Sequence, residues 1–489
     1  MAKKVDATKG NLAKLIFIYT LPLIFSTILQ NMFNIADKAV LGNMAGSTAV
    51  AAIGATTVVS TLIINGAIGL STGTSIILAR LVGQKDTEKI KQTIDTSLIT
   101  AALIGLFLAI AGVLFSPIIL TATDCPVECY DGAVLYMRIC LAGAPATLLY
   151  NYGSAILRTL GDTQKPLLYI TIAGIVNVGL NVILCLILPQ KVMAVAIATV
   201  ASKIVSVILV LRRISRFDKK FSFHLLRMRP RLPTFAQIIR FGIPTSLSNL
   251  MVPLSNLQIT PAINSFGVAA VAGNSAATSI QGIASAFSSG FGIATTTFVG
   301  QNLGAKQPER VKQSFWLLLG FNFLITGTLG VLFYLSGRFW LGVILGASET
   351  SAIEYGMTRL LYVCLFIFVL AINNILSHAL QAFGYPLFTS ISSISFTLGF
   401  RVLWMLMVYP KFPTINTIML CYLVSWVLNM ILYATFFTVV YRRYTKKGIC
   451  KKYRFWGIFS PRGIVPLDLA KYHYYRGISP TARIRSLSA

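Results

Sequence analysis

The chain has few charged residues for its length, and very few of them are acidic. Of its 489 residues only 11% are charged, and 14 Asp and Glu stand against 42 Lys and Arg. Hydrophobic residues make up 55% of the chain, which is more than an ordinary soluble domain contains. The scarcity of charge therefore excludes a typical soluble protein and favours a membrane protein.

Several catalytic and metal-binding patterns are also missing from the sequence. The seven cysteines and three histidines form no metal-ligand spacing. There is no Walker A loop, HExxH motif or GxSxG motif. We therefore expect no enzymatic activity, no cofactor and no firm metal site, and the missing Walker A loop argues against an ATP-driven exporter.

The formal net charge is +28, which in a soluble protein would suggest nucleic-acid binding. Here the basic residues gather in the segments between apolar runs, as the positive-inside rule requires. That rule places the basic segments and both termini in the cytoplasm. We expect a multi-pass protein of the plasma membrane that has no nucleic-acid partner.

Apolar runs of about 20 residues or more, long enough to cross a bilayer, recur along the chain with the period of a helix. The alternating pattern of a membrane β-barrel is absent from the sequence. We predict twelve spans, at 12–42, 49–79, 93–117, 131–157, 166–188, 192–212, 235–265, 270–300, 313–336, 353–381, 387–408 and 416–442.

A basic segment divides these spans into two sets of six. We predict an N-lobe at 1–211, a cytoplasmic linker at 212–234, a C-lobe at 235–442 and a basic cytoplasmic tail at 443–489. The start of the tail is rich in Lys and Arg, so we expect it to lie against anionic lipid headgroups at about 1 kcal/mol per basic residue.

The two halves share a sequence repeat. Residues 66–93 recur in residues 287–314 at a constant offset of 221, and one residue of slippage pairs Pro22 with Pro244. The matched pairs include Gly69 with Gly290, Gly83 with Gly304, and Lys85 with Lys306. Because each half has an even number of spans, both insert in the same orientation. The predicted fold is an all-α integral membrane protein with twelve transmembrane helices in two pseudo-symmetric six-helix lobes.

Asp37 is the carboxylate that lies deepest within a predicted span. Gln30, Asn34 and Asp37 follow one another at helical spacing and form one polar face that can line a cavity. A charge in a membrane helix costs about 2.5–3.5 kcal/mol, and burial favours the protonated carboxyl group. Asp37 is therefore the candidate proton carrier; the alternative is a buried Asp satisfied by Lys38 or by neighbouring polar groups.

A second polar group lies in the fifth and sixth predicted spans. Asn177 and Asn181 are one helical turn apart, and Thr199 in the next span can face them. Their oxygen atoms can coordinate Na⁺ or bond to a protonated acid. The alternative, which spacing alone favours, is that these side chains join helices within the membrane.

Prolines interrupt two of the predicted helices. Pro22 lies in the first span, and Pro244 and Pro253 lie in the seventh. Because proline removes a backbone hydrogen bond, we predict that these residues bend their helices; a gently curved helix is the alternative.

Five further ionisable residues lie in or near the spans. Arg401, Lys203 and His378 lie within spans, and the sequence assigns them no partner. Asp95 and Glu354 lie near span ends, where we expect hydrated side chains.

The chain resembles the MATE family (multidrug and toxic compound extrusion), in particular its DinF-like prokaryotic branch. The resemblance rests on LARLVGQKDTEK and its copy VGQNLGAKQPER, on LRTLGDTQKP (157–166) and its counterpart LQAFGYP (380–386), and on FNIADKAVLG (33–42). It implies two lobes around a central cavity, and export of cationic, amphipathic molecules in exchange for H⁺ or Na⁺.

The resemblance also implies a cation site in the N-lobe. Asp37, Asn177 and Thr199 match three of its positions, whereas Asn181 stands where prokaryotic relatives have Asp. The missing charge disfavours tight Na⁺ binding, so we expect H⁺ as the coupling ion, with Na⁺ held by Asp37, Asn177 and Thr199 as the alternative. The corresponding C-lobe stretches, GIPTSLSNLMVPLSNLQ and FIFVLAINNILSHALQ, contain no carboxylate, which disfavours a C-lobe Na⁺ mechanism.

We therefore expect a monomeric antiporter that exports cationic or amphipathic small molecules by alternating access of its two lobes. Three alternatives remain: a Na⁺-coupled drug antiporter, a lipid-linked oligosaccharide flippase, and a membrane scaffold that transports nothing. A flippase needs several basic residues in its central cavity, and the candidates are few: Arg138, Lys203 and Arg401.

Overall fold

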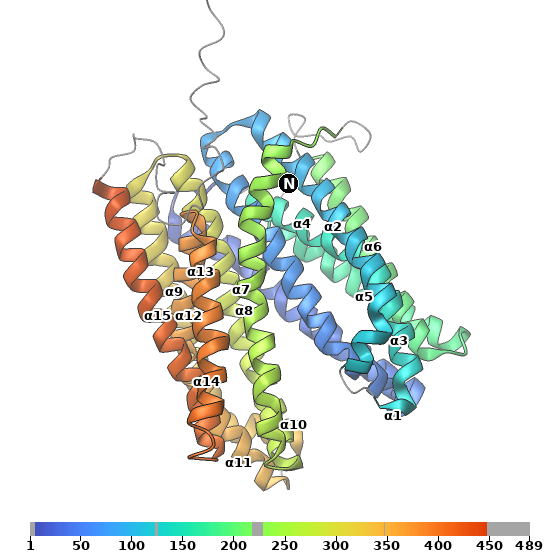
Figure 1. The fold of residues 1–489 in the computed structure, drawn as a ribbon. Helices are drawn as coiled ribbons and strands as arrows, with labels where there is room; N and C mark the ends of the chain where they lie inside the picture. Colours follow the sequence, from blue (N-terminus) through green and yellow to red (C-terminus); the bar gives the residue numbers. More distant parts are fainter. Residues whose placement is uncertain (1–4, 123–125, 218–227, 347, 447–489) are drawn as a thin grey trace, which may run out of the picture. The chain divides into compact units, whose positions relative to one another are not determined.

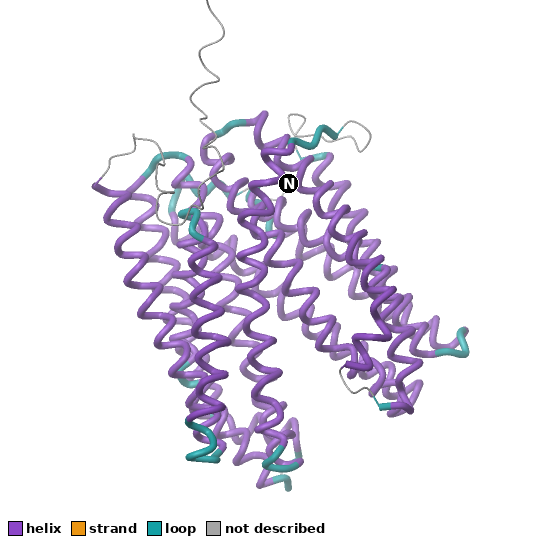
Figure 2. Tube along the Cα trace, viewed as in Figure 1, coloured by secondary structure: helices purple, strands orange, loops and turns teal. Residues whose placement is uncertain are grey.

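The computed structural model describes residues 5–122, 126–217, 228–346 and 348–446, apart from the side chains at 34–39, 41–51, 58 and 446. These residues form helices joined by short loops, and no strand occurs among them (Figure 2). Residues Met1–Arg442 form one compact unit, and Arg443–Ala489 form a second. The predicted all-α fold is confirmed.

The helices of the first half are α1 (Leu12–Gln84), α2 (Thr87–Ala122), α3 (Val127–Ala142), α4 (Ala144–Thr159), α5 (Gln164–Ile187) and α6 (Lys191–Ser215). Those of the second half are α7 (Leu232–Asn264), α8 (Val268–Gly304), α9 (Pro308–Leu335), α10 (Gly337–Leu345), α11 (Thr350–Arg359), α12 (Ile367–Ala382), α13 (Pro386–Ser392), α14 (Phe400–Met407) and α15 (Ile415–Lys446). Two π-helical stretches, η2 (Leu360–Cys364) and η3 (Ser393–Gly399), join α11 to α12 and α13 to α14.

Among the described residues, nine helical segments are long and apolar enough to cross a membrane, and the bent pair α3–α4 makes a tenth. Two of the nine, Leu12–Phe33 and Ala52–Gln84, belong to α1. Helices α7 and α8, of 33 and 37 residues, coincide with the two remaining predicted spans but are not among these apolar segments. Both pack against α1, so protein rather than lipid covers part of their surface.

Helix α1 contains two spans because the chain turns back within it. Just before α1, the backbone N–H of Ala7 donates to the side-chain oxygen of Gln301 at 3.1 Å. Near the end of α1, Gly83 packs against the backbone of the same Gln301. A straight helix of 73 residues would instead separate its ends by roughly 110 Å. Our first two predicted spans, 12–42 and 49–79, left a loop at 43–48. That prediction is wrong, because residues 43–48 are helical.

Within the unit of residues 1–442 the helices form two bundles, which Figure 1 shows side by side. Helices α1–α6 lie in one bundle and α7–α15 in the other, and α1 packs against α7 and α8 across the interface. The bundles lie closest at the end where the described chain begins, and they diverge toward the end that carries α10 and α11. We call the first of these the inner end.

At the inner end the second span of α1 crosses α8 at two glycines of the repeat. A Cβ atom on Gly83 would overlap the backbone of Gln301, and one on Gly304 would overlap the backbone of Arg80. Because 80 and 301 are themselves related by the offset of 221, the crossing is symmetric. The two helices can touch backbone to backbone only because both positions lack a side chain.

The turns that follow the repeated segments have the same hydrogen bonds in both halves. Lys85 and Lys306 are the only described residues other than glycine with a positive φ, at 58° and 56°. The residue after each lysine donates to a carbonyl five positions earlier, Asp86 to Leu81 and Gln307 to Asn302, which is the bond of a Schellman motif. The sequence repeat is thus also a repeat of backbone conformation.

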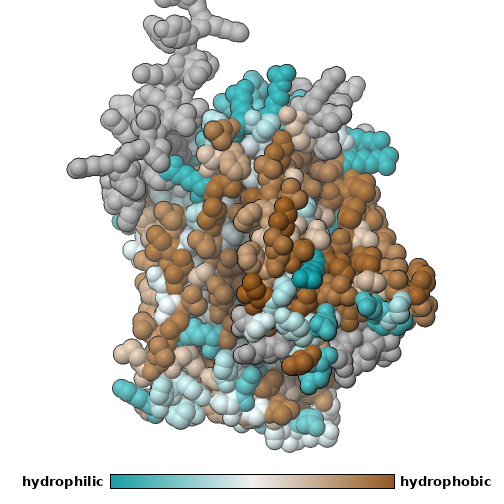
Figure 3. Space-filling model, turned by 45° about the vertical axis from the view of Figure 1, so that its right-hand side comes forward, coloured by the Kyte–Doolittle hydropathy of each residue, from teal (hydrophilic) through white to brown (hydrophobic). Residues whose placement is uncertain are grey.

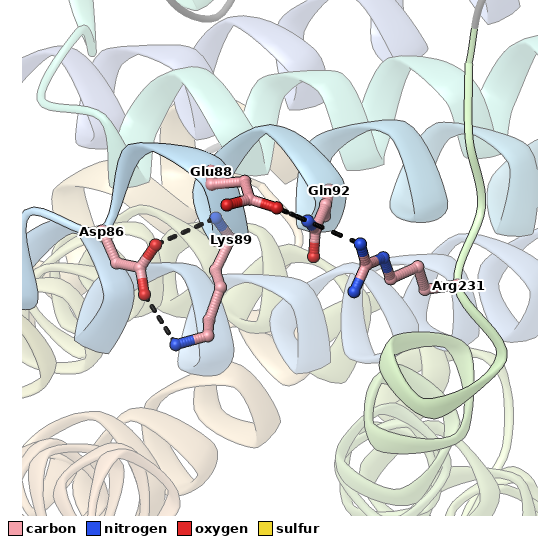
Figure 4. Close-up of polar contacts among 5 residues, drawn as sticks. All are labelled: Asp86, Glu88, Lys89, Gln92 and Arg231. Carbon is pink, nitrogen blue, oxygen red and sulfur yellow. Dashed lines mark hydrogen bonds and ion pairs between the residues drawn. The ribbon is translucent and has the colours of Figure 1, made fainter. Parts of the chain in front are cut away.

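The first turn of α2 carries a small network of surface charges (Figure 4). Asp86 accepts hydrogen bonds from the backbone N–H and the ammonium group of Lys89, at 3.1 and 2.7 Å. The hydrogen bonds and charge of Lys89 lower the pKa of Asp86. Glu88 accepts a hydrogen bond from Gln92 and lies 4.0 Å from Arg231, which precedes α7. This exposed pair links the two bundles weakly.

Large apolar side chains cover the outside of the helices (Figure 3). Leu186, Ile187, Leu335 and Leu406 are each about 70% exposed. In Figure 3 apolar side chains dominate the middle of the visible surface, and polar ones gather mostly toward the two ends. That distribution is the one expected of a surface in contact with lipid.

We predict that Gly304→Ala destabilises the protein by about 1–3 kcal/mol, because its methyl group meets backbone that cannot move aside. Gly320→Ala in α9 is the matched control, since no atom lies within 4 Å of its new Cβ; it should stabilise its helix by about 0.5–1 kcal/mol. Thermal unfolding of the purified variants measures both effects. Equal midpoints for the two variants would contradict the proposed backbone contact.

Candidate functional site

The predicted N-lobe site begins at a close contact between α1 and α5. The ring of Phe33 occupies the space that a Cβ atom on Gly174 would need. One turn farther along α1 the backbone reaches Asp37, and one turn farther along α5 it reaches Asn177. The contact therefore brings the α1 segment with Asp37 to the part of α5 that carries the amides.

The side chains of Asn34 and Asp37 lie outside the described residues, so their part in this site stays a prediction. Gln30, one turn before Asn34, is half-buried.

The α5 residues of the predicted site are buried. Asn177 is 5% exposed and Asn181 is fully buried. Among the described side chains the nitrogen of Asn177 finds no hydrogen-bond partner, which leaves a donor for an added ligand or an acid. Such a group is costly to bury unless something binds it.

Thr199 in α6 donates its hydroxyl proton to the carbonyl oxygen of Val195 at 2.9 Å. Only its lone pairs then remain for a cation or a protonated acid. Among the described side chains no hydrogen bond joins Thr199 to Asn177, so the structure places the two on packed helices without joining them directly.

The predicted helix-bending prolines lie inside continuous helices. Pro22 is buried in α1, and Pro244, Pro253 and Pro261 lie within α7. The carbonyl oxygens of Pro22 and Pro244 accept hydrogen bonds from Ser26 and Ser248, at 2.8 and 3.2 Å. Whether these residues act as bending points stays a prediction.

Sequence reasoning missed a polar centre in the second half. Arg401 in α14 is 1% exposed, and it donates to the hydroxyl oxygens of Ser425 at 2.9 Å and Ser255 at 3.1 Å. Arg359 in α11 is 4% exposed, and it donates to Asn274 at 2.8 Å and Gln281 at 2.9 Å. We call these two arginines and their partners the C-lobe arginine centre.

The ring of Tyr422 in α15 completes this centre. The guanidinium carbons of Arg401 and Arg359 lie 4.3 and 5.3 Å from the ring centroid, within the range of cation–π attraction. The signal in the sequence was the pair of arginines inside spans of a half whose central helices have no carboxylate. We gave Arg401 no partner, and we did not single out Arg359.

Three other in-span or span-end residues also have a definite environment. His378 exchanges a hydrogen bond of 2.9 Å with Thr296 on α8. Glu354 is exposed and pairs with Arg338 at 2.6 Å, as expected of a hydrated side chain. The expectation for Asp95 was wrong: it is 4% exposed, because the third turn of α2 is already covered by neighbouring protein.

The inner end is closed by reciprocal hydrogen bonds between the bundles. Gln301 in α8 donates to the carbonyl oxygen of Thr159 at 2.8 Å, and Arg80 in α1 donates to that of Ala382 at 3.1 Å. These carbonyls precede equivalent turns, in which Gly161 and Gly384 have φ near 90°. Each bundle thus donates a hydrogen bond to the equivalent turn of the other bundle, the turn at Gly161 or the turn at Gly384.

The segment before α1 adds to this closure. The N–H of Val5 donates to Gly161 of the first bundle at 3.1 Å. The guanidinium group of Arg310, from the second bundle, donates to Ala7 at 3.0 Å and to Gly10 at 3.2 Å. Residues 5–10 therefore tie the two bundles together at the inner end.

Comparison with known proteins gives the same assignment over most of the chain. The MatE family model matches residues 22–185 and 244–405, one stretch in each half and together more than half of the chain. Probable multidrug resistance protein YoeA of Bacillus subtilis (strain 168) is 27% identical over 396 residues, which cover 79% of this chain and 84% of that protein. A FAD transporter of Shewanella oneidensis is 30% identical over 305 residues, covering 60% and 65%.

The fold agrees with solved structures. A crystal structure of MATE in the straight conformation has a TM-score of 0.81 at 22% identity, and the match covers 90% of this chain and 100% of that one. The chain is therefore a multi-pass membrane protein that belongs to the MatE family of multidrug efflux transporters.

Proposed function

We propose that the protein is a proton-coupled antiporter that exports cationic or amphipathic small molecules by alternating access of its two bundles. The observation that carries the proposal is the contact of Phe33 with Gly174, which brings the segment with Asp37 beside the buried amide of Asn177. Relatives named for multidrug resistance support the substrate class.

In this proposal Asp37 is ionised while a cation is bound and takes up a proton from outside. Protonation removes a buried charge, so the substrate's electrostatic attraction weakens and the substrate leaves. The amide of Asn177 and the lone pairs of Thr199 bond to the carboxyl group in one state or the other. Each inward-moving charge supplies about 2.3 kcal/mol per 100 mV of membrane potential.

The choice of H⁺ over Na⁺ rests on Asn181. With a neutral amide at this buried position the site has one carboxylate instead of two. The binding free energy of Na⁺ is therefore less favourable than at a site with two carboxylates. The proposal keeps both termini in the cytoplasm, the protein monomeric in the plasma membrane, and the tail at 443–489 against anionic lipids.

Alternating access requires that the inner end opens. The crossing at Gly83 and Gly304 and the hydrogen bonds of Arg80, Gln301 and the 5–10 segment are the contacts that must separate. In the conformation described here they are formed.

We predict that Asp37→Asn abolishes proton-driven export and leaves expression unchanged, because the amide cannot exchange a proton. The measurement is uptake of a fluorescent cation into liposomes that contain the purified protein and an imposed pH gradient. Glu354→Gln, which removes an exposed carboxyl group, is the control and should transport normally. Normal proton-driven transport by Asp37→Asn would contradict the proposal.

We further predict that a pH gradient alone drives transport and that a Na⁺ gradient alone does not. The two gradients are applied separately to the same liposomes, with the membrane potential held constant. Pumping under the Na⁺ gradient alone would refute the assignment of the coupling ion.

Gln301→Leu should loosen the inner end. It leaves the N–H of Ala7 and the carbonyl of Thr159 without partners, at about 1–3 kcal/mol each. Hydrogen–deuterium exchange of residues 5–10 should become roughly tenfold to a hundredfold faster. Gln313→Leu, at an exposed position of α9, is the control. Unchanged exchange in Gln301→Leu would contradict this role.

A further inference from the structure

The C-lobe arginine centre lies where the second half repeats the predicted site of the first. The slippage that pairs Pro22 with Pro244 also pairs Asn34 with Asn256 and Asp37 with Ile259. The second half therefore keeps an amide on its first helix and loses the acid.

The same comparison places an arginine on the counterpart of α5. Aligning Pro166 with Pro386, which end the equivalent loops, pairs Asn181 with Arg401 at an offset of 220. A buried amide in one half thus corresponds to a buried guanidinium group in the other. The second site would therefore favour a negatively charged ligand, whereas the first would favour a cation.

The centre has more hydrogen-bond donors than acceptors. A guanidinium group carries five N–H donors and no acceptor. Arg401 uses its Nε and Nη1 atoms on Ser425 and Ser255, and Arg359 uses Nη1 and Nη2 on Asn274 and Gln281. The Nε atom of Arg359 is buried, and no described residue accepts a hydrogen bond from it. An added acceptor would therefore find donors already in place.

The centre also lacks a negative charge. Every protein oxygen that accepts from Arg359 or Arg401 belongs to a neutral amide or hydroxyl group, and among the described residues no carboxylate pairs with either. Both guanidinium groups lie over the ring of Tyr422. Two buried cations that share one aromatic ring favour an anion nearby.

Both arginines lie next to a π-helical stretch of the backbone. The π-helical stretch η2 begins directly after Arg359, and η3 ends two residues before Arg401. A π-helical turn widens the helix and changes which side chains face one direction, and such turns are frequent at functional sites. Among the described residues the helices of the first half contain no π-helical stretch.

A hydrogen bond connects the C-lobe arginine centre to an exposed polar residue, Asn256. The hydroxyl group of Tyr422 donates to the side-chain oxygen of Asn256 at 3.1 Å, and Asn256 is exposed. Asn256 is the counterpart of Asn34 in the polar face of α1. A ligand that displaces this bond would lie against Tyr422 and the arginines behind it.

We propose that the C-lobe arginine centre binds an oxoanion, the carboxylate or phosphate of an amphipathic organic molecule. The planar guanidinium fork matches the two oxygens of such a group. As a substrate site it rests on the proposed transport function, and among the amphipathic molecules proposed there it favours those that carry an acidic group.

The binding test needs no transport, so its failure and the failure of proton coupling are distinguishable. The full chain is purified into nanodiscs of neutral phosphatidylcholine and titrated by calorimetry with benzoate and with benzylammonium, which present the same ring with opposite charges. We expect benzoate to bind and benzylammonium not to bind at this centre.

Arg401→Asn, which installs the residue found at position 181, should weaken benzoate binding about tenfold to a hundredfold. Arg359→Lys keeps the positive charge but loses the two parallel N–H donors of the guanidinium group, so it should weaken benzoate binding by a smaller factor. This variant still tests the centre if Arg401→Asn fails to fold. The matched control is Arg338→Gln, an exposed arginine paired with Glu354, which should bind benzoate like the parent protein. Size-exclusion chromatography and thermal unfolding confirm that each variant is folded.

A lipid headgroup is the other source of an oxoanion, and a second arm tests it. Nanodiscs with phosphatidylglycerol are compared with neutral ones, and mass spectrometry measures the lipid that each variant retains. Benzoate binding that depends on Arg401 and is insensitive to phosphatidylglycerol supports a transported anion. Phosphatidylglycerol retained by the parent protein and lost in Arg401→Asn supports the oxoanion site with lipid as its ligand. Benzoate binding and lipid retention that are both unaffected by Arg401→Asn and Arg359→Lys overturn the proposal.

Discussion

The structure depends on one steric constraint, the missing side chains where the two bundles cross. At Gly83 and Gly304 the helices touch through their backbones, so the helix axes come closer than side chains would allow. Only at that separation can Gln301 reach Thr159 and Arg80 reach Ala382. Residues 5–10 then fill the remaining space. The close approach continues along α1, where Gly69 and Gly73 meet the backbone of α7 at Ser246 and Gly242.

Duplication preserved the scaffold and changed the chemistry. The crossing glycines, the Schellman turns at Lys85 and Lys306, and the turns at Gly161 and Gly384 are equivalent in both halves. These features need particular backbone conformations, so they tolerate little change. Asn181 and Arg401, in contrast, are equivalent in position and different in charge. In our proposal the two related sites therefore respond to ligands of opposite charge.

Much of the fold could be predicted from the sequence, because helical periodicity and the repeat are local patterns. The spans, their grouping and the pairing of Gly83 with Gly304 all follow from these patterns. The helical state of 43–48 and the stretches η2 and η3 were not predicted, because local sequence patterns do not reveal them. Arg359 was missed for the same reason: its partners Asn274 and Gln281 lie on another helix. Asn177 and Asn181 were identified because amides one turn apart in an apolar helix are conspicuous.

The docking of residues 5–10 has a consequence for biosynthesis. This segment is synthesised before the helices, yet two of the residues that hold it, Gln301 and Arg310, are made about 300 residues later. At 5–20 residues per second this delay is about 15–60 s. During that time the first bundle must be held in the membrane without its final closure. Residues 5–10 are therefore made early but are among the last to reach their final position.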